Sequence, residues 1–250
     1  MERKKYIAGL VLFLGLFAWP GFVLAQLSSQ EQIYEAYARG KMDKWYTIMS
    51  DFESNTVNPT SKQNMELLSY YYGYTGWLIS VEDYDRALYY IEKSEDLMND
   101  MSKYNDKNPT ILAYRGAFIA YEIGISSYKA IYLGRRSMGL IEEALEIDPN
   151  NIQAHIEMGN AMYYCPTTFG GDKKVAIKHY KKAGQLMEKR GLVKNNWMYL
   201  NVMTSLGMAY EATDNIMDAK LCYEKILVVK PNFMWVGEEL YPDMLKRHNL

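Results

Sequence analysis

Cysteine, histidine and proline are scarce in this chain of 250 residues, which has two cysteines, three histidines and seven prolines. Two cysteines exclude a disulfide-framework fold and any zinc module built on several cysteines. The few prolines, together with 17 glycines, exclude collagen-like and low-complexity chains. What remains is an ordinary globular chain, long enough for one domain or two small ones.

An excess of charge of one sign is also missing. The chain has 28 basic and 30 acidic side chains, a formal net charge of -2, so no bulk attraction draws it to nucleic acid. Hydrophobic residues make up 49% and charged residues 23%, a composition typical of folded and not of disordered chains. We therefore expect a folded protein with no nucleic-acid partner.

The first 25 residues have the three-part pattern of a secretory signal peptide. Basic residues at positions 3–5 precede an apolar run over 7–19, and Ala25 ends a stretch that suits a signal peptidase. We expect cleavage after Ala25. The product would be a soluble exported protein, periplasmic or secreted, without stable membrane insertion.

An uncleaved anchor is the alternative, because residues 7–25 approach the ~20 apolar residues of a membrane-spanning helix. Pro20 and Gly21 interrupt that helix and favour cleavage. No cysteine stands next to Gln26, so a bacterial lipoprotein anchor has no attachment residue. Removing residues 1–25 takes away three basic residues and one acidic residue, which moves the net charge from -2 to -4.

Export makes the two cysteines relevant, because an oxidising compartment permits disulfides. Cys165 and Cys222 each have aromatic or aliphatic neighbours in the sequence. Two buried thiols that act as small hydrophobic side chains are one interpretation, and a single bridge is the other. The sequence leaves both open.

After residue 25 the chain lacks strand signals and consists of paired amphipathic segments between short polar breaks. The clearest pair covers about 200–233. We expect Gly207 and Ala219 to face each other where the two helices approach closely, with Tyr210 and Tyr223 filling the wedge between them. Pro231 ends the second helix because it has no N–H to donate.

The spacing in this pair resembles the tetratricopeptide repeat. Gly207 follows a leucine, a tyrosine comes three residues later, Ala219 twelve later, an aromatic residue four after that, and Pro231 twelve after the alanine. A second copy covers about 152–189, with a longer turn between its helices in which Asp172 is placed to cap the second helix. Its structural positions are Gly159, Ala176, Tyr180 and Ala183.

Weaker pairs precede these two copies, at about 29–56, 64–100 and 109–149, and a capping helix is expected at about 235–248. Such units cannot bury their apolar faces alone, so they are stable only when several stack together. The resemblance therefore implies an all-α fold over 26–250. Its architecture is an α-α superhelix of about five helix hairpins and a C-terminal capping helix.

Arrays of this family hold an extended peptide or a helix of a partner on a concave face lined by the first helix of each pair. The resemblance implies a binding module for a protein or peptide, and leaves the partner's identity and the oligomeric state open. By repeat position, the expected partner-binding residues are Tyr72, Gln153, Ile156, Asn160, Tyr163, Tyr164, Asn201, Thr204, Met208 and Glu211.

Tyrosines concentrate in one expected helix, at positions 70–72 and 74. Three consecutive residues span about 300° of an α-helix, so we expect at least one ring to face solvent or the groove. The alternative is that helices in a solenoid are buried on two sides, so that all four rings lie in the core.

Motifs for catalysis, metals and cofactors are missing. There is no G-x-S-x-G elbow and no phosphate-binding glycine loop, and we expect no cofactor and no enzymatic activity. His155 and His179 fall on adjacent expected helices and can touch, but no H-E-x-x-H spacing supports a metal site. A lysine stripe is expected to be the solvated side of a helix and consists of Lys173, Lys174, Lys178, Lys181 and Lys182.

Two other functions remain alternatives to a protein-binding module. One is an accessory ligand-binding component of an envelope transport system, for which helical-repeat proteins are also used. The other is a hydrolase that uses Cys165 with a histidine as a thiol–imidazole nucleophile.

Overall fold

The computed structural model describes residues 27–103, 105 and 107–250, and in these ranges every regular element is helical. The all-α superhelix expected from the sequence is confirmed. The expected signal peptide over 1–25 lies outside the described residues. Within the described ranges, no helix combines the length and the hydropathy that crossing a bilayer needs.

Consecutive helices pair into five hairpins. These are α1 (Ser29–Ala38) with α2 (Met42–Asn55), α3 (Ser61–Ser80) with α4 (Tyr84–Ser102), α5 (Pro109–Ile125) with α6 (Ala130–Ile147), α7 (Ile152–Tyr164) with α8 (Lys173–Lys189), and α9 (Trp197–Glu211) with α10 (Ile216–Val229). Short 3-10 turns at Ser127–Lys129 and Thr167–Phe169 lie inside two of the connections. A π-helical segment at Trp235–Leu240 leads into α11 (Tyr241–Arg247), in the region expected for a capping helix.

Local capping signals explain where several helices begin and end. Asp172 caps α8 as expected, because its Oδ1 accepts hydrogen bonds from the backbone N–H groups of Lys174 and Val175 at 2.8 and 3.2 Å. Lys230 is extended ahead of Pro231, so α10 stops at Val229. A capping box of Thr60 and Gln63 starts α3 at Ser61, slightly before the expected start of this pair at about position 64.

The glycines of the two best-matched repeats lie under tyrosine rings. A Cβ atom added at Gly159 would lie 2.6 Å from the ring of Tyr180, and one at Gly207 would lie 2.6 Å from the ring of Tyr223. The ring of Tyr223 thus takes the space that a side chain at position 207 would fill, and the expectation that Gly207 faces Ala219 stays a prediction. The missing side chain serves a flat aromatic contact between the two helices of the hairpin.

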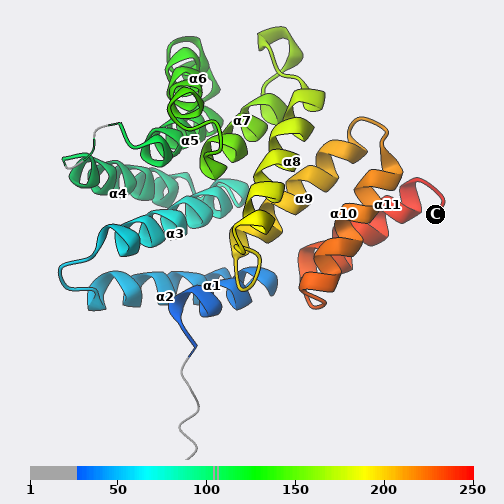
Figure 1. Ribbon diagram of the computed structural model, residues 1–250, viewed down its shortest axis with the longest axis horizontal. Helices are drawn as coiled ribbons and strands as arrows, with labels where there is room; N and C mark the ends of the chain where they lie inside the picture. The colour runs from blue at the N-terminus through cyan, green and yellow to red at the C-terminus, as the bar shows by residue number, and fades with distance from the viewer. Residues whose placement is uncertain (1–26, 104, 106) are drawn as a thin grey trace, which may run out of the picture.

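The hairpins follow one another around a curve that brings the first one beside the fifth (Figure 1). The ring of Trp197 on α9 lies 5.0 Å from that of Trp45 and 5.5 Å from that of Tyr37, centroid to centroid. Asn195 Nδ2 donates to Glu31 Oε1 at 2.8 Å across the same junction. The inner face of the superhelix is therefore closed at the end where α9 begins.

The tyrosine cluster of α3 is entirely buried, with Tyr70, Tyr71, Tyr72 and Tyr74 each no more than 4% exposed. The expectation that one of these rings faces solvent or an open groove is wrong. Helix α3 packs against α2, α4 and α5, and Trp197 approaches Tyr72 to 6.3 Å between ring centroids. The closed superhelix therefore covers α3 on more sides than an isolated stack of hairpins does.

Candidate functional site

The residues expected to contact a partner divide into a buried group and an open group. Tyr72, Gln153, Ile156 and Thr204 are buried, so a partner could touch them only if neighbouring helices moved. Asn160, Tyr163, Asn201, Met208 and Glu211 are partly exposed, and Tyr164 is 69% exposed. The partner-binding role assigned to all ten remains a prediction.

Four of the open residues lie at the C-terminal ends of α7 and α9. Tyr163 and Tyr164 are the last two residues of α7, while Met208 and Glu211 lie in the last turn of α9. Burial raises the pKa of Tyr163, and the nearby carboxylate of Glu211 raises it further. We call these four residues the concave opening.

Tyr164 packs against neighbouring side chains although solvent reaches most of its ring. Burial raises the pKa of its hydroxyl, followed by the effect of Tyr163, whose ring meets it edge to face at 4.8 Å between centroids. The hydroxyl of Tyr164 also acts on those of Tyr37 and Tyr121, whose pKa values are raised mainly by burial. Tyrosines from α1, α5 and α7 therefore converge below the concave opening.

Asn160 joins three helices beneath this opening. Its Nδ2 donates to the hydroxyl of Tyr72 at 3.1 Å and to Glu157 Oε2 at 3.0 Å, and its Oδ1 accepts from the hydroxyl of Tyr180 at 2.8 Å. Both amide protons are therefore used inside the protein. The expected bonding of a peptide backbone by Asn160 is limited to the remaining lone pair of Oδ1.

Asn201 keeps more capacity for a partner. Its Nδ2 donates to the hydroxyl of Tyr37 at 3.1 Å, which leaves one amide proton and the carbonyl oxygen. This bond also ties α9 to α1. Asn201 thus has a structural role and retains groups that a partner can use.

Glu157 is a central residue that the sequence pattern did not single out. It is 4% exposed, and its Oε1 accepts from Gln153 Nε2 at 2.6 Å. Burial raises the pKa of its carboxyl to about 7, against hydrogen bonds from Asn160, Tyr72 and Gln153 that lower it. The spacing of Gln153, Glu157 and Asn160 along α7 places three polar groups on one face, a signal that the sequence contains.

The expected contact of His155 with His179 is confirmed. Their Nδ1 atoms lie 3.0 Å apart, and Nε2 of His155 lies 3.0 Å from the carbonyl oxygen of Pro149. Since the carbonyl can only accept, His155 carries its proton on Nε2 and accepts from His179 at Nδ1. Burial lowers the pKa of both rings.

Metal ligands do not assemble around this histidine pair. In the ranges that the structure describes, no three histidine, cysteine or acidic side chains gather as a metal site would require. Nearby lysines oppose a cation as well, since Lys182 lowers the pKa of His155 and Lys178 that of His179. The pair is a partly buried hydrogen-bonded contact between α7 and α8.

The cysteines are free thiols in two different settings. Cys165 at the end of α7 donates its S–H to the carbonyl of Phe169 at 3.4 Å, and Cys222 is buried, which raises the pKa of its thiol to about 11. His155 lies in the first turn of α7, about 15 Å from Cys165 along the helix axis. This separation opposes a thiol–imidazole pair of Cys165 and His155, while His179 bonds to His155.

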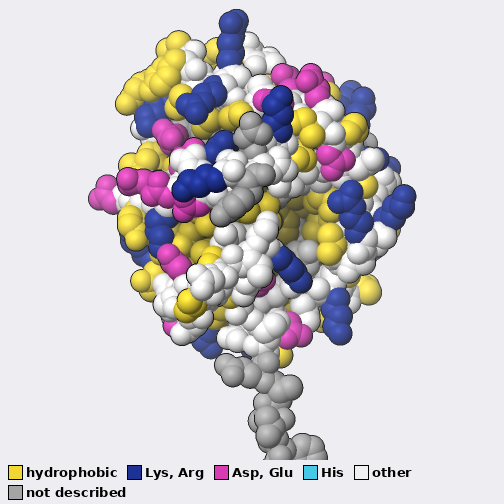
Figure 2. Space-filling view, turned by 60° about the vertical axis from the view of Figure 1, so that its left-hand side comes forward, with side chains coloured by type: hydrophobic (Ala, Val, Ile, Leu, Met, Phe, Trp, Pro, Cys, Tyr) yellow, Lys and Arg dark blue, Asp and Glu magenta, His cyan; other side chains and the backbone are white. Residues whose placement is uncertain are grey.

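Charges of both signs are spread over the surface. Figure 2 shows acidic and basic side chains interspersed on one face of the molecule, with hydrophobic side chains between them. Four residues of the lysine stripe on α8 are exposed, and Lys182 is half-buried. This stripe forms the solvated side of α8, as its spacing predicts.

Comparison with known proteins adds information on the fold. No protein-family model and no curated protein matches the sequence. Among solved structures, the HusA haemophore from Porphyromonas gingivalis is similar, with a TM-score of 0.58 and 16% sequence identity over 74% of this chain and 92% of that chain. The similarity supports the helical fold, and the assignment to the tetratricopeptide family stays a prediction.

Proposed function

We propose that this chain is an exported, non-catalytic binding protein that holds a protein or peptide partner at the concave opening. The supporting observation is the contrast between the two ends of the inner face. One end is closed by the contact of Trp45 with Trp197, while the other presents Tyr164, 69% exposed, above converging tyrosine hydroxyls. Partly exposed aromatic and apolar side chains gathered on one face suit contact with a segment of a partner.

The side chains at the opening fit a partner with an apolar anchor and polar flanks. Tyr163 and Tyr164 offer flat rings with a hydroxyl at the tip, and Met208 adapts its shape to what it contacts. Glu211 is paired with Arg247, whose Nη2 lies 2.7 Å from Oε1, so the opening carries no free negative charge from this residue. A short extended segment or a protruding apolar side chain fits this chemistry better than a long helix does.

Export is part of the proposal. The pattern over 1–25 supports a cleaved signal peptide and a soluble protein in the periplasm or outside the cell. Intact-mass measurement of the protein from the envelope fraction tests this, with a chain that begins at Gln26 as the expected result. A chain that retains residues 1–25 and sediments with the membrane would contradict it.

Capture from the envelope fraction of the exporting cell tests the binding site. The chain from Gln26 onward is immobilised, and captured proteins are quantified against Tyr164→Ala, Met208→Ala and the control Tyr128→Ala. Tyr128 is a matched control because it is 68% exposed but lies on another segment, in a 3-10 turn. We expect a captured protein that both opening variants lose and the control keeps. Equal capture by all variants would contradict this site.

A second candidate function is a ligand-binding component of an envelope transport system, with haem as the candidate ligand. The structural similarity to a protein named as a haemophore, over 92% of that chain, motivates it, and so do the rings of Tyr163 and Tyr164 at the opening. Titration of haem is followed by its visible absorbance in the wild type and in Tyr164→Ala. Saturable haem binding by the wild type that is weaker in Tyr164→Ala supports the candidate. A haem absorbance spectrum that the wild-type protein does not change contradicts it.

A further inference from the structure

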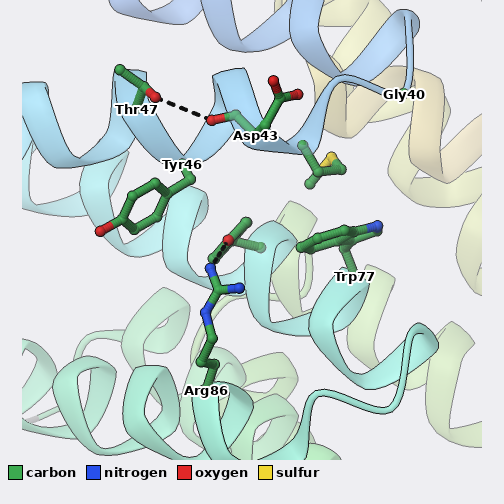
Figure 3. A pocket seen from close by; sticks show the side chains of 8 residues that line it. Gly40, Asp43, Tyr46, Thr47, Trp77 and Arg86 are labelled. Atoms are coloured by element: carbon green, nitrogen blue, oxygen red, sulfur yellow. Dashed lines mark hydrogen bonds between the residues drawn. The ribbon is translucent and has the colours of Figure 1, made fainter.

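A recess lies between the first two hairpins, away from the concave opening. It has a volume of about 560 Å³ and is lined by residues of α2, α3 and α4 near the turns of these hairpins. Figure 3 shows Tyr46 from α2 and Trp77 from α3 on opposite sides, with Arg86 of α4 reaching between them. Tyr74 contributes to the lining and is buried.

Arg86 is fixed in this recess by four contacts. It donates one hydrogen bond to the hydroxyl of Tyr74, and its Nη1 lies 3.2 Å from the carboxylate of Asp83. Its guanidinium carbon lies 5.7 Å from the ring centre of Tyr46 and 5.5 Å from that of Tyr74. A guanidinium has five N–H donors, so several remain for a ligand and are already oriented.

Acceptors and apolar surface also line the recess. Asp43 adds a carboxylate, and the hydroxyl of Thr47, which donates to the backbone oxygen of Asp43 at 3.2 Å, can accept through its own oxygen. Tyr46 and Trp77 supply flat rings, of which Tyr46 is exposed. The recess thus combines donors, acceptors and aromatic faces.

The charge balance selects the class of ligand. Asp83 offsets the charge of Arg86, and Asp43 adds a negative one, so anions gain little here. An organic cation gains little either, because the guanidinium of Arg86 already lies over the ring faces of Tyr46 and Tyr74. A purely apolar ligand would cover polar groups without bonding them, which costs free energy.

We propose that this recess binds one or two rings of a neutral saccharide. Sugar hydroxyls donate and accept, which matches Arg86 on one side and Asp43 with Thr47 on the other. The C–H face of a pyranose packs against the flat ring of Trp77, as apolar groups do on aromatic faces, while Tyr46 holds Arg86 in place. The volume of about 560 Å³ falls within the range of roughly 300–1,000 Å³ found for small-molecule sites.

Isothermal titration of the chain from Gln26 onward with maltotriose, cellotriose and triacetylchitotriose tests the proposal. We expect saturable binding of at least one trisaccharide and a loss of affinity of at least about tenfold in Tyr46→Ala. The exposed position of Tyr46 makes this variant compatible with folding, which its circular dichroism melting curve checks. Asp43→Asn, which keeps the shape of the side chain, should also weaken binding.

Two control variants separate this site from its surroundings. Tyr89 is an exposed tyrosine on α4 that does not line the recess. The variant Tyr89→Ala should therefore bind sugar like the wild type. Tyr164→Ala should also keep full affinity, which distinguishes this site from the concave opening. Binding of none of the three sugars, or unchanged affinity in both Tyr46→Ala and Asp43→Asn, would overturn the proposal. Displacement of the sugar by inorganic phosphate would also overturn it, because it would indicate an anion site.

Discussion

Trp45 and Trp197 meet edge to face with ring centroids 5.0 Å apart, and this contact joins the first hairpin to the fifth. The indole N–H of Trp45 also donates to the backbone oxygen of Tyr70 at 3.2 Å, which fixes its ring against α3. The closure converts a row of hairpins into a ring-like core. It also decides which residues of the inner face remain accessible.

Removing Trp197 should destabilise the whole protein, because its side chain is 4% exposed and contacts rings from three helices. We expect Trp197→Ala to lower the free energy of unfolding by about 3–5 kcal/mol in urea denaturation. Trp235→Ala is the control, since Trp235 is exposed, and its loss should be much smaller. A loss below about 1 kcal/mol for Trp197→Ala would contradict the closed superhelix.

Stability should fall with rising pH because of Glu157. Burial raises the pKa of its carboxyl from 4.5 to about 7, so the folded state disfavours the charged form. The contribution of the neutral Glu157 carboxyl to stability is fully present below about pH 4.5 and is lost as the pH rises through 7. At pH 8 this shift lowers the free energy of unfolding by about 3 kcal/mol relative to its value at low pH.

The variant Glu157→Gln measures this effect because its side chain is neutral at every pH and keeps one acceptor oxygen. Urea denaturation at pH 5 and pH 8 should show a smaller loss of stability for the variant than for the wild type. Glu146→Gln, at an exposed carboxylate of α6, should follow the wild type. Identical pH dependence of stability in all three proteins would contradict the raised pKa of the buried Glu157 carboxyl.

The histidine pair should act in the opposite direction. Burial lowers the pKa of His155 and His179, so the folded state disfavours their protonated forms. Their contribution is present above the unfolded value of about 6.5 and is lost as the pH falls below it. We expect His179→Gln to flatten the loss of stability between pH 7 and pH 5, with His248→Gln as the control. An unchanged slope in His179→Gln would count against the pair.

Two glycine substitutions should change stability with opposite signs. A Cβ at Gly207 would lie 2.6 Å from the ring of Tyr223, so Gly207→Ala should cost about 1–3 kcal/mol through displacement of the ring. Gly139 lies inside α6 with open space around it, so Gly139→Ala should stabilise by about 0.5–1 kcal/mol. Thermal unfolding of both variants provides the comparison, and a stabilised Gly207→Ala would refute the packing described for this hairpin.

Features that depend on neighbouring residues were predictable from the sequence. The cap at Asp172 and the stop before Pro231 follow from one or two side chains and the backbone beside them. The contact of His155 with His179 follows from the pairing of adjacent helices. Such features need no knowledge of how the hairpins are arranged.

Features that depend on the whole curve were not predictable in this way. Tyr72 is buried because Trp197 closes over it, and the distance between them is set by the rotation at every hairpin junction. The charge state of Glu157 depends on the same enclosure. The recess of Tyr46 and Arg86 also combines residues of two hairpins, and no local motif marks it.

Site-specific photocrosslinking in the exporting cell tests the central claim, that a partner lies at the concave opening. A benzoylphenylalanine is placed at position 164 in one strain and at position 128 in another, since these tyrosines are 69% and 68% exposed. The account predicts a discrete crosslinked species from position 164 and none from position 128. A crosslinked species from position 128 alone would contradict it and would place the partner on the turn between α5 and α6.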